Sequence, residues 1–185
     1  TGENGSGKST LIKLLLGYYI PIEGEVELYI DRKSIRGKKI REFVSFDSGL
    51  VSVFEGTLKD NICMNQEYNE SRFAQAIELV NLTDFLRDKT KGYWIESDGK
   101  NLSSGQRRKI ALARAFYRDS PVVVLDEPTT NLDQASTEEI FRTLRNVCKD
   151  KICLIVTHDS ALVAQCDRVI RLDHRVLSEN VDSIS

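Results

Sequence analysis

Residues 2–9 read Gly2-Glu3-Asn4-Gly5-Ser6-Gly7-Lys8-Ser9, which matches the phosphate-binding pattern G-x-x-x-x-G-K-[ST]. The glycines of this pattern let successive backbone N–H groups turn toward a phosphate with no side chain in the way. Lys8 places a positive charge at the β- and γ-phosphates, and the Ser9 hydroxyl ligates Mg²⁺. The apolar residues that follow predict a helix over residues 9–16, whose N-terminus faces the same anion. This stretch therefore predicts a nucleotide-binding loop.

A second pattern is a pair of carboxylates at the end of an apolar run. Val122–Leu125 predicts a strand that is buried on both faces, and Asp126 and Glu127 follow it directly. An aspartate in such a place often only caps a helix. Beside a phosphate loop, however, Asp126 is predicted to hold Mg²⁺ through water, and Glu127 to orient the water that attacks the γ-phosphate. The pair therefore predicts nucleotide hydrolysis as well as binding.

A third pattern, Leu102-Ser103-Ser104-Gly105-Gln106, lies just before a predicted helix that runs to about Tyr117. By itself it is a capped helix start. A serine hydroxyl and unpaired N–H groups at a helix N-terminus also form an anion site. One nucleotide does not need two such sites from one chain, but two copies that face each other would use both.

The alternation of predicted strands and helices indicates an α/β fold with a mainly parallel sheet flanked by helices. Strands are predicted over residues 25–30, 43–46, 122–126 and 152–156, with a closing hairpin at 169–172 and 176–177. Residues 31–39 and 89–101 are expected to be connections, and Ser136-x-x-Glu139 is expected to be a capping box that starts a further helix. The polar helical stretch over residues 57–117 interrupts the alternation, and we expect it to form an inserted helical subdomain.

The composition excludes several classes of protein. The 185 residues include 26 Lys and Arg against 28 Asp and Glu, a net charge of −2 that argues against a protein that wraps nucleic acid. Hydrophobic residues at 41% and charged residues at 29% are ordinary for a globular domain. No apolar run approaches the roughly 18–20 residues that a membrane span requires. The four cysteines form no C-x-x-C pair, which suggests reduced thiols in a cytosolic setting.

In their order along the chain, the motifs resemble those of the ATP-binding domain of ABC transporters, which has a P-loop NTPase fold. The resemblance covers nearly the whole chain and rests on a Walker A loop (Gly2–Ser9), a signature sequence (Leu102–Gln106), a Walker B strand (Val122–Glu127), a D-loop (Asn131–Asp133) and a switch histidine (His158). The chain has no initiator methionine, and its first motif begins at residue 2. We therefore expect one ATPase domain over residues 1–185 that lacks the N-terminal strands of a longer protein.

The resemblance implies a head-to-tail dimer with two ATP molecules at its interface. Each would lie between the Walker A loop of one chain and the signature helix of the other. Glu127, His158 and Lys8 are implied as catalytic residues, with His158 at the γ-phosphate, and Ser9 and Asp126 as the residues that hold Mg²⁺. The residues implied in nucleotide binding are Gly2, Glu3, Asn4, Gly5, Ser6, Gly7, Lys8, Ser9, Thr10, Ser103, Ser104, Gly105, Gln106 and Asp133, the last of which would help to join the two sites.

Two weaker likenesses favour an exporter. Phe54–Ile62 resembles the stretch after the Q-loop in exporter-type members, and Ile95–Leu102 resembles the exporter stretch that leads into the signature. They imply an ATPase at the cytoplasmic face of the plasma (inner) membrane that powers transmembrane transport, with a transmembrane domain in the same chain or in a separate subunit. Two alternatives stay open at this point: a non-transport relative that acts on nucleic acid or ribosomes, and a module that binds nucleotide without hydrolysing it.

The chain departs from the family pattern at two further places. Ser104 stands where the family usually has glycine. No glutamine occurs before Gln66, so the glutamine of the Q-loop is missing. Near its expected place, Asp47 and Ser48 are the side chains with oxygens to offer, and Asp47 brings a charge that Mg²⁺ favours. The alternative is that residues 47–49 are simply a surface turn.

Overall fold

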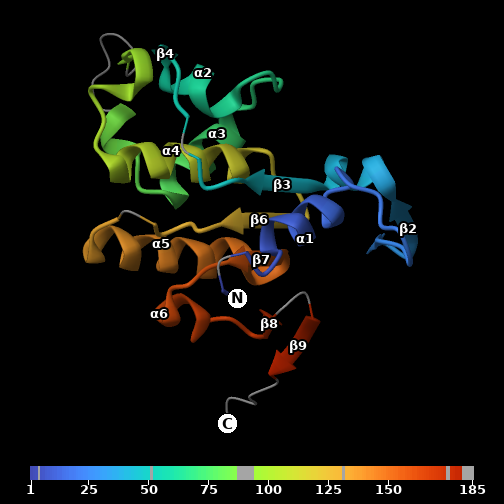
Figure 1. The fold of residues 1–185 in the computed structure, drawn as a ribbon. Helices are drawn as coiled ribbons and strands as arrows, with labels where there is room; N and C mark the ends of the chain where they lie inside the picture. The colour runs from blue at the N-terminus through green and yellow to red at the C-terminus, as the bar shows by residue number, and fades with distance from the viewer. Residues whose placement is uncertain (4, 51, 87–93, 131, 174–175, 181–185) are drawn as a thin grey trace. The chain divides into compact units, whose positions relative to one another are not determined.

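The chain divides into two compact units (Figure 1), and each is described by itself. Residues 45–155 form one unit, and residues 1–44 together with residues 156–185 form the other. The computed structural model describes residues 1–3, 5–50, 52–86, 94–130, 132–173 and 176–180. Among these described residues, no helix has the length and apolar character that crossing a membrane would take.

The unit of residues 45–155 contains a three-stranded parallel sheet. Its strands, in spatial order, are β3 (Val44–Asp47), β6 (Val122–Asp126) and β7 (Ile152–Val156). The predicted strands over residues 122–126 and 152–156 are confirmed with the same bounds, and β3 lies one residue further along than predicted. Because the carboxyl ends of parallel strands meet at one edge, Asp47 and Asp126 end neighbouring strands at the edge where such sheets bind ligands.

The first part of the helical stretch predicted over residues 57–117 consists of separate short helices. They are α2 (Leu58–Cys63), α3 (Glu70–Leu79) and a 3₁₀ turn, η2 (Thr83–Leu86). They are separate because Thr57 and Asn69 each start a helix of their own, with a side chain that accepts a backbone N–H of the first turn. Both helices pack against α4 (Ser104–Tyr117), which has the bounds that the sequence predicted.

Part of the stretch expected to be loop has short regular elements. β5 (Trp94–Ile95) pairs antiparallel with β4 (Gly56–Thr57), and a 3₁₀ turn, η3 (Ser97–Gly99), follows. Two residues carry too little periodicity for a strand to be predicted from sequence. Residues 89–93 of the expected loop lie outside the described residues, and the boundaries of the helical subdomain at residues 57 and 117 stay a prediction.

The next helix, α5 (Gln134–Val147), ends in a 3₁₀ turn, η4 (Cys148–Asp150). The predicted capping box from Ser136 to Glu139 is wrong. The N-cap is Asp133, whose carboxylate accepts the Ser136 N–H at 2.9 Å and the Ser136 hydroxyl at 2.8 Å. Both residues are good caps, and a helix that begins after Asp133 gains most of a turn over one that begins after Ser136. Glu139 therefore lies in the second turn, where it reaches a neighbouring helix.

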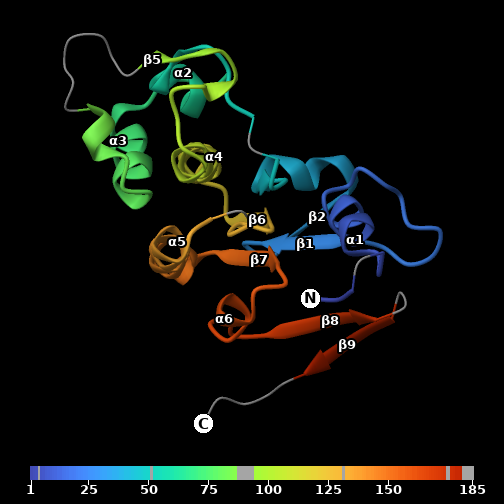
Figure 2. The ribbon, with the colours of Figure 1, turned by 60° about the vertical axis from the view of Figure 1, so that its left-hand side comes forward.

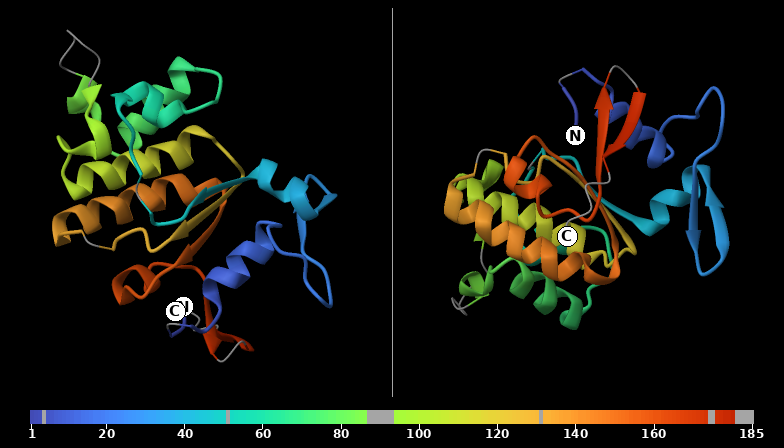
Figure 3. Two further views of the ribbon diagram at one scale, coloured as in Figure 1. Left: turned by 45° about the horizontal axis from the view of Figure 1, so that its top comes forward. Right: turned by 90° about the horizontal axis from the view of Figure 1, so that it is seen from below.

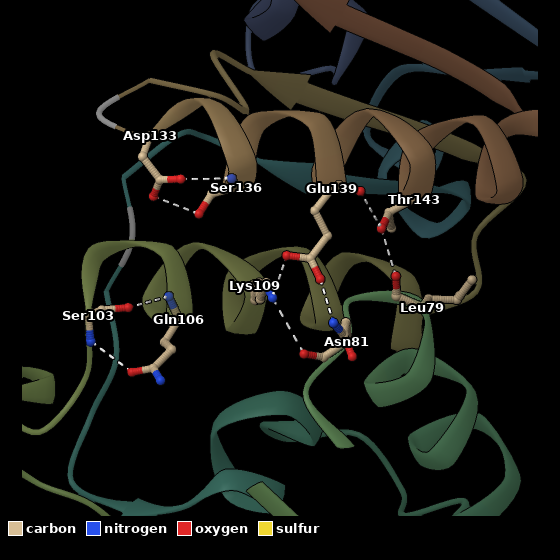
Figure 4. A network of polar contacts seen from close by, with 9 residues as sticks. All are labelled: Leu79, Asn81, Ser103, Gln106, Lys109, Asp133, Ser136, Glu139 and Thr143. Carbon is tan, nitrogen blue, oxygen red and sulfur yellow. Dashed lines mark hydrogen bonds and ion pairs between the residues drawn. The ribbon is translucent and has the colours of Figure 1, made fainter. Parts of the chain in front are cut away.

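A polar network holds α4 and α5 side by side (Figures 2 and 3). The Glu139 carboxylate on α5 accepts hydrogen bonds from Lys109 Nζ on α4 at 2.7 Å and from Asn81 Nδ2 at 2.6 Å (Figure 4). One turn further along α5, the Thr143 hydroxyl donates to the Leu79 carbonyl at 2.7 Å. The Lys109 bond joins α5 to α4, and the Asn81 and Thr143 bonds join α5 to the end of α3 and the residues after it. The N-termini of α4 and α5 lie at the same end of the pair.

The other unit is assembled from shorter elements. They are α1 (Lys8–Leu15), β1 (Glu27–Ile30), β2 (Lys33–Arg36), the 3₁₀ helix η1 (Gly37–Phe43), α6 (Ser160–Val163), β8 (Val169–Asp173) and β9 (Val176–Asn180). The predicted helix, first strand and closing hairpin are confirmed, with shifts of one to three residues at their ends. Thr1 pairs with β8, since its carbonyl accepts the Leu172 N–H at 2.9 Å.

Strand β2 corrects the prediction of a turn-rich connection over residues 31–39. It pairs antiparallel with β1, and the hairpin turns on Asp31 and Arg32, whose φ angles are 48° and 64°. Such left-handed values are usual in two-residue hairpin turns, where Asn and Gly are the preferred residues. Arg32 is not one of the preferred residues at the second position of such a turn, so the sequence did not predict the hairpin.

The polar network predicts a measurable contribution to stability. Glu139→Gln keeps the size of the side chain but removes the charge that Lys109 meets at 2.7 Å. Hydrogen bonds to charged groups contribute about 1.5–3 kcal/mol, and this pair is partly exposed, so we expect the unfolding free energy to fall by about 1–2 kcal/mol at pH 7. Urea or thermal unfolding measures the loss. Glu138→Gln is the matched control, because Glu138 is exposed and accepts a bond from Gln134 of its own helix. Equal losses in the two variants would contradict the assignment.

The same network predicts a pH dependence. Burial works to raise the pKa of the Glu139 carboxyl above its ordinary 4.5, but the hydrogen bonds from Lys109 and Asn81 outweigh burial and lower the pKa. A carboxyl whose pKa is lowered by folding stabilises the protein above its unfolded-state pKa, and this contribution is lost as the pH falls through the folded-state value. The difference in unfolding free energy between the parent and Glu139→Gln should therefore be largest at neutral pH and shrink below pH 4.5. A constant difference down to about pH 3 would refute it.

Candidate nucleotide-binding site

The loop before α1 is shaped around the Lys8 side chain. The Lys8 ammonium donates to the Gly2 and Glu3 carbonyls, each at 2.7 Å. Gly7, with a left-handed φ of 103°, leads the loop into the helix at an angle that a residue with a Cβ rarely adopts. Two carbonyls of the loop thus hold the ammonium at the start of α1. Asn4, which was predicted to bind nucleotide, lies outside the described residues.

The N-terminus of α1 has the properties of an anion site. Its N-cap is Gly7, no side chain caps it, and its first turn contains no acidic residue. Ser9 and Thr10 are exposed in this first turn. The Ser6 hydroxyl is buried in the loop and has no hydrogen-bond partner among the described residues. Backbone N–H groups, hydroxyls and a cation therefore converge where a phosphate fits, which supports the predicted roles of residues 2–10.

The two carboxylates after β6 occupy the ligand-binding edge of the parallel sheet. Asp126 ends the buried strand and is half-buried itself. Glu127 has a φ of 49°, a left-handed value that is uncommon for a residue with a side chain. Its carboxylate accepts a long hydrogen bond of 3.3 Å from the Thr130 hydroxyl. Strained backbone of this kind is concentrated at functional sites, so the position of Glu127 agrees with its predicted role.

The signature sequence begins α4 with a complete capping box. The Ser103 hydroxyl oxygen accepts the Gln106 N–H at 3.1 Å, and the Gln106 side-chain oxygen accepts the Ser103 N–H at 2.8 Å. Ser103 and Gln106 therefore have a structural role whether or not they also touch a nucleotide. Ser104 is exposed in the first turn, where its N–H and that of Gly105 have no acceptor within the helix.

Asp133 lies beside the signature sequence, at the start of α5 (Figure 4). The Ser136 N–H and hydroxyl hold its carboxylate in place and lower its pKa. A Cβ added to Gly105 would lie 3.3 Å from the Ser136 hydroxyl oxygen, so the two helix N-termini approach closely. The network around Glu139 thus brings two predicted site segments together. Asn131 of the predicted D-loop lies outside the described residues.

His158 follows β7 and is exposed to solvent. The turn that presents it is fixed on both sides. The Thr157 hydroxyl, which is buried, accepts the Asp159 N–H at 3.0 Å, and the Asp159 carboxylate accepts the N–H groups of Ala161 and Leu162 in α6. The chain therefore holds an imidazole outward at the end of a strand, as a ligand-sensing histidine requires.

Sequence analysis missed Arg108, which is buried in α4. Its guanidinium forms an ion pair with Asp47 at 2.9 Å. Asp47 is buried and also accepts the Gly49 N–H at 3.3 Å, so residues 47–49 form a turn, but one whose carboxylate faces the interior rather than the surface. Burial raises the pKa of Asp47, and Arg108 opposes the rise. The signal for Arg108 was present in the sequence, because it falls on the same helical face as the apolar Ala111, Leu112 and Ala115.

Comparison with known proteins agrees with the motifs and the fold. The sequence pattern of the family described as "ABC transporter" matches residues 1–130. The transport/processing ATP-binding protein ComA of Streptococcus pneumoniae is 32% identical over 183 residues, which cover 96% of this chain and 25% of that protein. The ATP-dependent lipid A-core flippase of Saccharophagus degradans is 31% identical over 177 residues, which cover 94% of this chain and 30% of the flippase.

A solved structure shows the same fold. The structure of a bacterial Atm1-family ABC exporter with ATP bound superimposes with a TM-score of 0.82 at 27% identity, over 96% of this chain and 32% of the exporter chain. The chain thus spans about a quarter to a third of the length of these relatives. The fold is that of a P-loop NTPase with a parallel sheet and flanking helices, and the chain belongs to the ABC transporter family.

Proposed function

We propose that this chain binds ATP with Mg²⁺ and hydrolyses it, as one half of a head-to-tail pair of ATP-binding domains that drives export through a membrane-spanning partner. The observation that carries the proposal is the start of α1. There Lys8 is held by two loop carbonyls at 2.7 Å, beside a helix N-terminus that no side chain caps. A triphosphate supplies the negative charge that this arrangement lacks.

The phosphate-binding residues of the proposal are those of the loop and the start of α1, and its metal-holding residues are the ones that the family motifs imply. Gly5, Gly7 and the first turn of α1 present N–H groups to the phosphates, with Lys8 at the β- and γ-phosphates. The Ser6 N–H instead donates to the Glu3 carbonyl at 3.2 Å.

The described residues contain no cluster of three or more His, Cys, Asp or Glu that could hold a metal alone. Mg²⁺ usually binds through one or two protein ligands together with phosphate oxygens, which suits Ser9 and Asp126. When bound, Mg²⁺ neutralises charge on the transferred phosphoryl group.

Hydrolysis also needs an oriented water molecule. Glu127 follows Asp126 directly and is the carboxylate at this edge that metal binding does not use. Its left-handed φ of 49° turns the chain sharply after the strand, which separates the direction of its side chain from that of Asp126. Glu127 thereby orients and polarises the water that attacks the γ-phosphate, and His158 contacts the same phosphate.

The signature helix serves the second ATP molecule of the pair. Ser103 and Gln106 satisfy part of its N-terminus from within, which leaves the N–H groups of Ser104 and Gly105 for an outside acceptor. Ser104 adds a hydroxyl at that position. These donors bind the γ-phosphate on the partner chain's loop. Asp133, which lies at the start of the neighbouring helix (Figure 4), helps to join the two sites in this proposal.

Export is the transport direction that the relatives support. One is a transport/processing protein, one is a flippase, and the solved structure is an exporter with ATP bound. All are longer than this chain, so the membrane-spanning part would come from outside residues 1–185. In this role the chain works at the cytoplasmic face of the membrane, where ATP is available.

Replacing Glu127 tests the hydrolytic role. Glu127→Gln keeps the shape of the side chain but cannot polarise water, so we expect ATP binding to persist while kcat falls by roughly 10²-fold or more. ATP should then trap the pair of domains as a stable dimer, which size exclusion detects. Hydrolysis at the parent rate in this variant would show that Glu127 does not act on the water.

Replacing Lys8 tests the binding role separately. Lys8→Ala removes charge-assisted bonds of about 1.5–3 kcal/mol, so we expect the Kd for ATP to rise by about 10-fold to 100-fold. Lys13→Ala is the matched control, because Lys13 is in the last turn of the same helix. Its Kd should stay within about twofold of the parent value, and an equal loss in both variants would point to general charge attraction instead.

A further inference from the structure

One buried guanidinium connects three segments of the unit formed by residues 45–155. Arg108 is 3% exposed and lies in α4, one turn after Ser104 of the signature sequence. Its Nη2 atom meets the Asp47 carboxylate at 2.9 Å, at the end of β3. Its Nε atom donates to the Pro128 carbonyl at 2.8 Å, directly after Glu127. The signature helix, the end of β3 and the chain after the Walker B strand are therefore joined through one side chain.

A second contact holds the residue before Glu127. Gly49 has a φ of 75°, and a Cβ at this position would lie 2.6 Å from the Asp126 carbonyl oxygen. The Gly49 N–H donates to the Asp47 carboxylate at 3.3 Å. The turn after β3 thus packs directly on the backbone of Asp126. Glu127 is held on both sides, by Gly49 through Asp126 and by Arg108 through Pro128.

The ion pair of Asp47 and Arg108 is better explained by its effect on the position of the backbone near Glu127 than by a contribution to the stability of the fold. Burying two charges is costly, and apolar side chains of similar size often stabilise a core as well or better. In addition, Arg108 Nη1 and Nη2 and Asp47 Oδ2 are buried and have no hydrogen-bond partner among the described residues, so the 2.9 Å approach of the two charges is an ionic contact and not a hydrogen bond. A guanidinium nevertheless differs from an apolar side chain and from lysine, because its Nε atom donates a directed hydrogen bond to the Pro128 carbonyl while its charge meets the Asp47 carboxylate at Nη2.

We propose that Asp47 and Arg108 are positioning residues for ATP hydrolysis, which set the backbone of Glu127 according to the position of the signature helix. This inference rests on the proposed function, in which Glu127 orients the attacking water. A phosphate bound at Ser104 and Gly105 fixes the first turn of α4. Arg108, one turn further on, transfers that position to Pro128, with Asp47 as the anchor that keeps the guanidinium in its plane.

The test removes both charges of the ion pair together, so that an effect on the position of Glu127 can be told apart from a loss of fold stability. Asp47→Val with Arg108→Met fills the same space without leaving a lone buried charge, so the fold should survive with a similar Tm. The variant is measured in the full-length protein reconstituted with its membrane-spanning part. We expect kcat for ATP to fall by about 10-fold to 100-fold, since small misplacements of catalytic groups have effects of this size. The KM for ATP should stay within about twofold of the parent value.

A second measurement reports on the backbone that Arg108 binds at Pro128. The Thr130 N–H donates to the Glu127 carbonyl at 3.3 Å, so its hydrogen exchange reports the turn that contains Pro128. Exchange at Thr130 should be faster in the double variant than in the parent. Arg107→Met is the matched control, because Arg107 is the neighbouring arginine on α4 and bonds at 3.4 Å to the exposed Asp98 carbonyl. It should change neither kcat nor this exchange rate.

The outcomes distinguish the two levels of the inference. A double variant with the parent kcat, or with unchanged exchange at Thr130, overturns the positioning role, and so does an equal loss of kcat in Arg107→Met. If the parent does not hydrolyse ATP, or if Glu127→Gln hydrolyses it at the parent rate, the proposed function fails and the positioning role fails with it. A lower kcat at constant KM and Tm, together with faster exchange at Thr130, supports the proposal.

Discussion

The chemistry of this chain depends on how each helix satisfies the backbone N–H groups at its N-terminus. Every helix begins with N–H groups that have no acceptor within the helix. In the part of the chain that the structure describes, five helices, α2 to α6, meet this demand with a side chain, namely that of Thr57, Asn69, Ser103, Asp133 and Asp159. α1 begins at Gly7 without such a side chain, and Lys8 adds a positive charge at the same place. The protein therefore meets the same physical demand itself at these five helices, whereas at α1 we propose that a bound phosphate meets it.

The capped starts of α4 and α5 differ from the start of α1, because their own side chains hold the first turn in a fixed conformation. Glu139 ties α5 to Lys109 of α4 and to Asn81, with all distances under 3 Å to its carboxylate. As a result, the signature sequence and Asp133 cannot move independently of each other. In the proposed pair of ATP-binding domains, a partner chain that binds to one of these segments would therefore act on both.

The parts of the fold and site that sequence predicted are those set by local spacing. The phosphate loop, the strand Val122–Asp126 and the helix that Ser103 caps each depend on residues within one turn or one strand. What sequence did not predict depends on a choice between local options or on distant partners. Ser136 and Asp133 are both good caps, and the hairpin turn at Asp31 and Arg32 uses residues that seldom take left-handed φ angles. The ion pair of Asp47 and Arg108 joins residues that only the packing of α4 on the sheet brings together.

Asp47 of that ion pair lies near the expected position of the Q-loop glutamine, which this chain lacks. A glutamine in the Q-loop would offer an oxygen to the metal, whereas the Asp47 carboxylate forms an ion pair with Arg108 at 2.9 Å. The end of β3 therefore acts on the site through backbone rather than through a ligand: Gly49 packs on the Asp126 carbonyl, and Arg108 binds the Pro128 carbonyl at 2.8 Å. Because Pro128 has no N–H and a restricted φ, a fixed carbonyl there leaves the preceding residue little freedom. The preceding residue is Glu127, so the constraint falls on the carboxylate that we propose orients the attacking water.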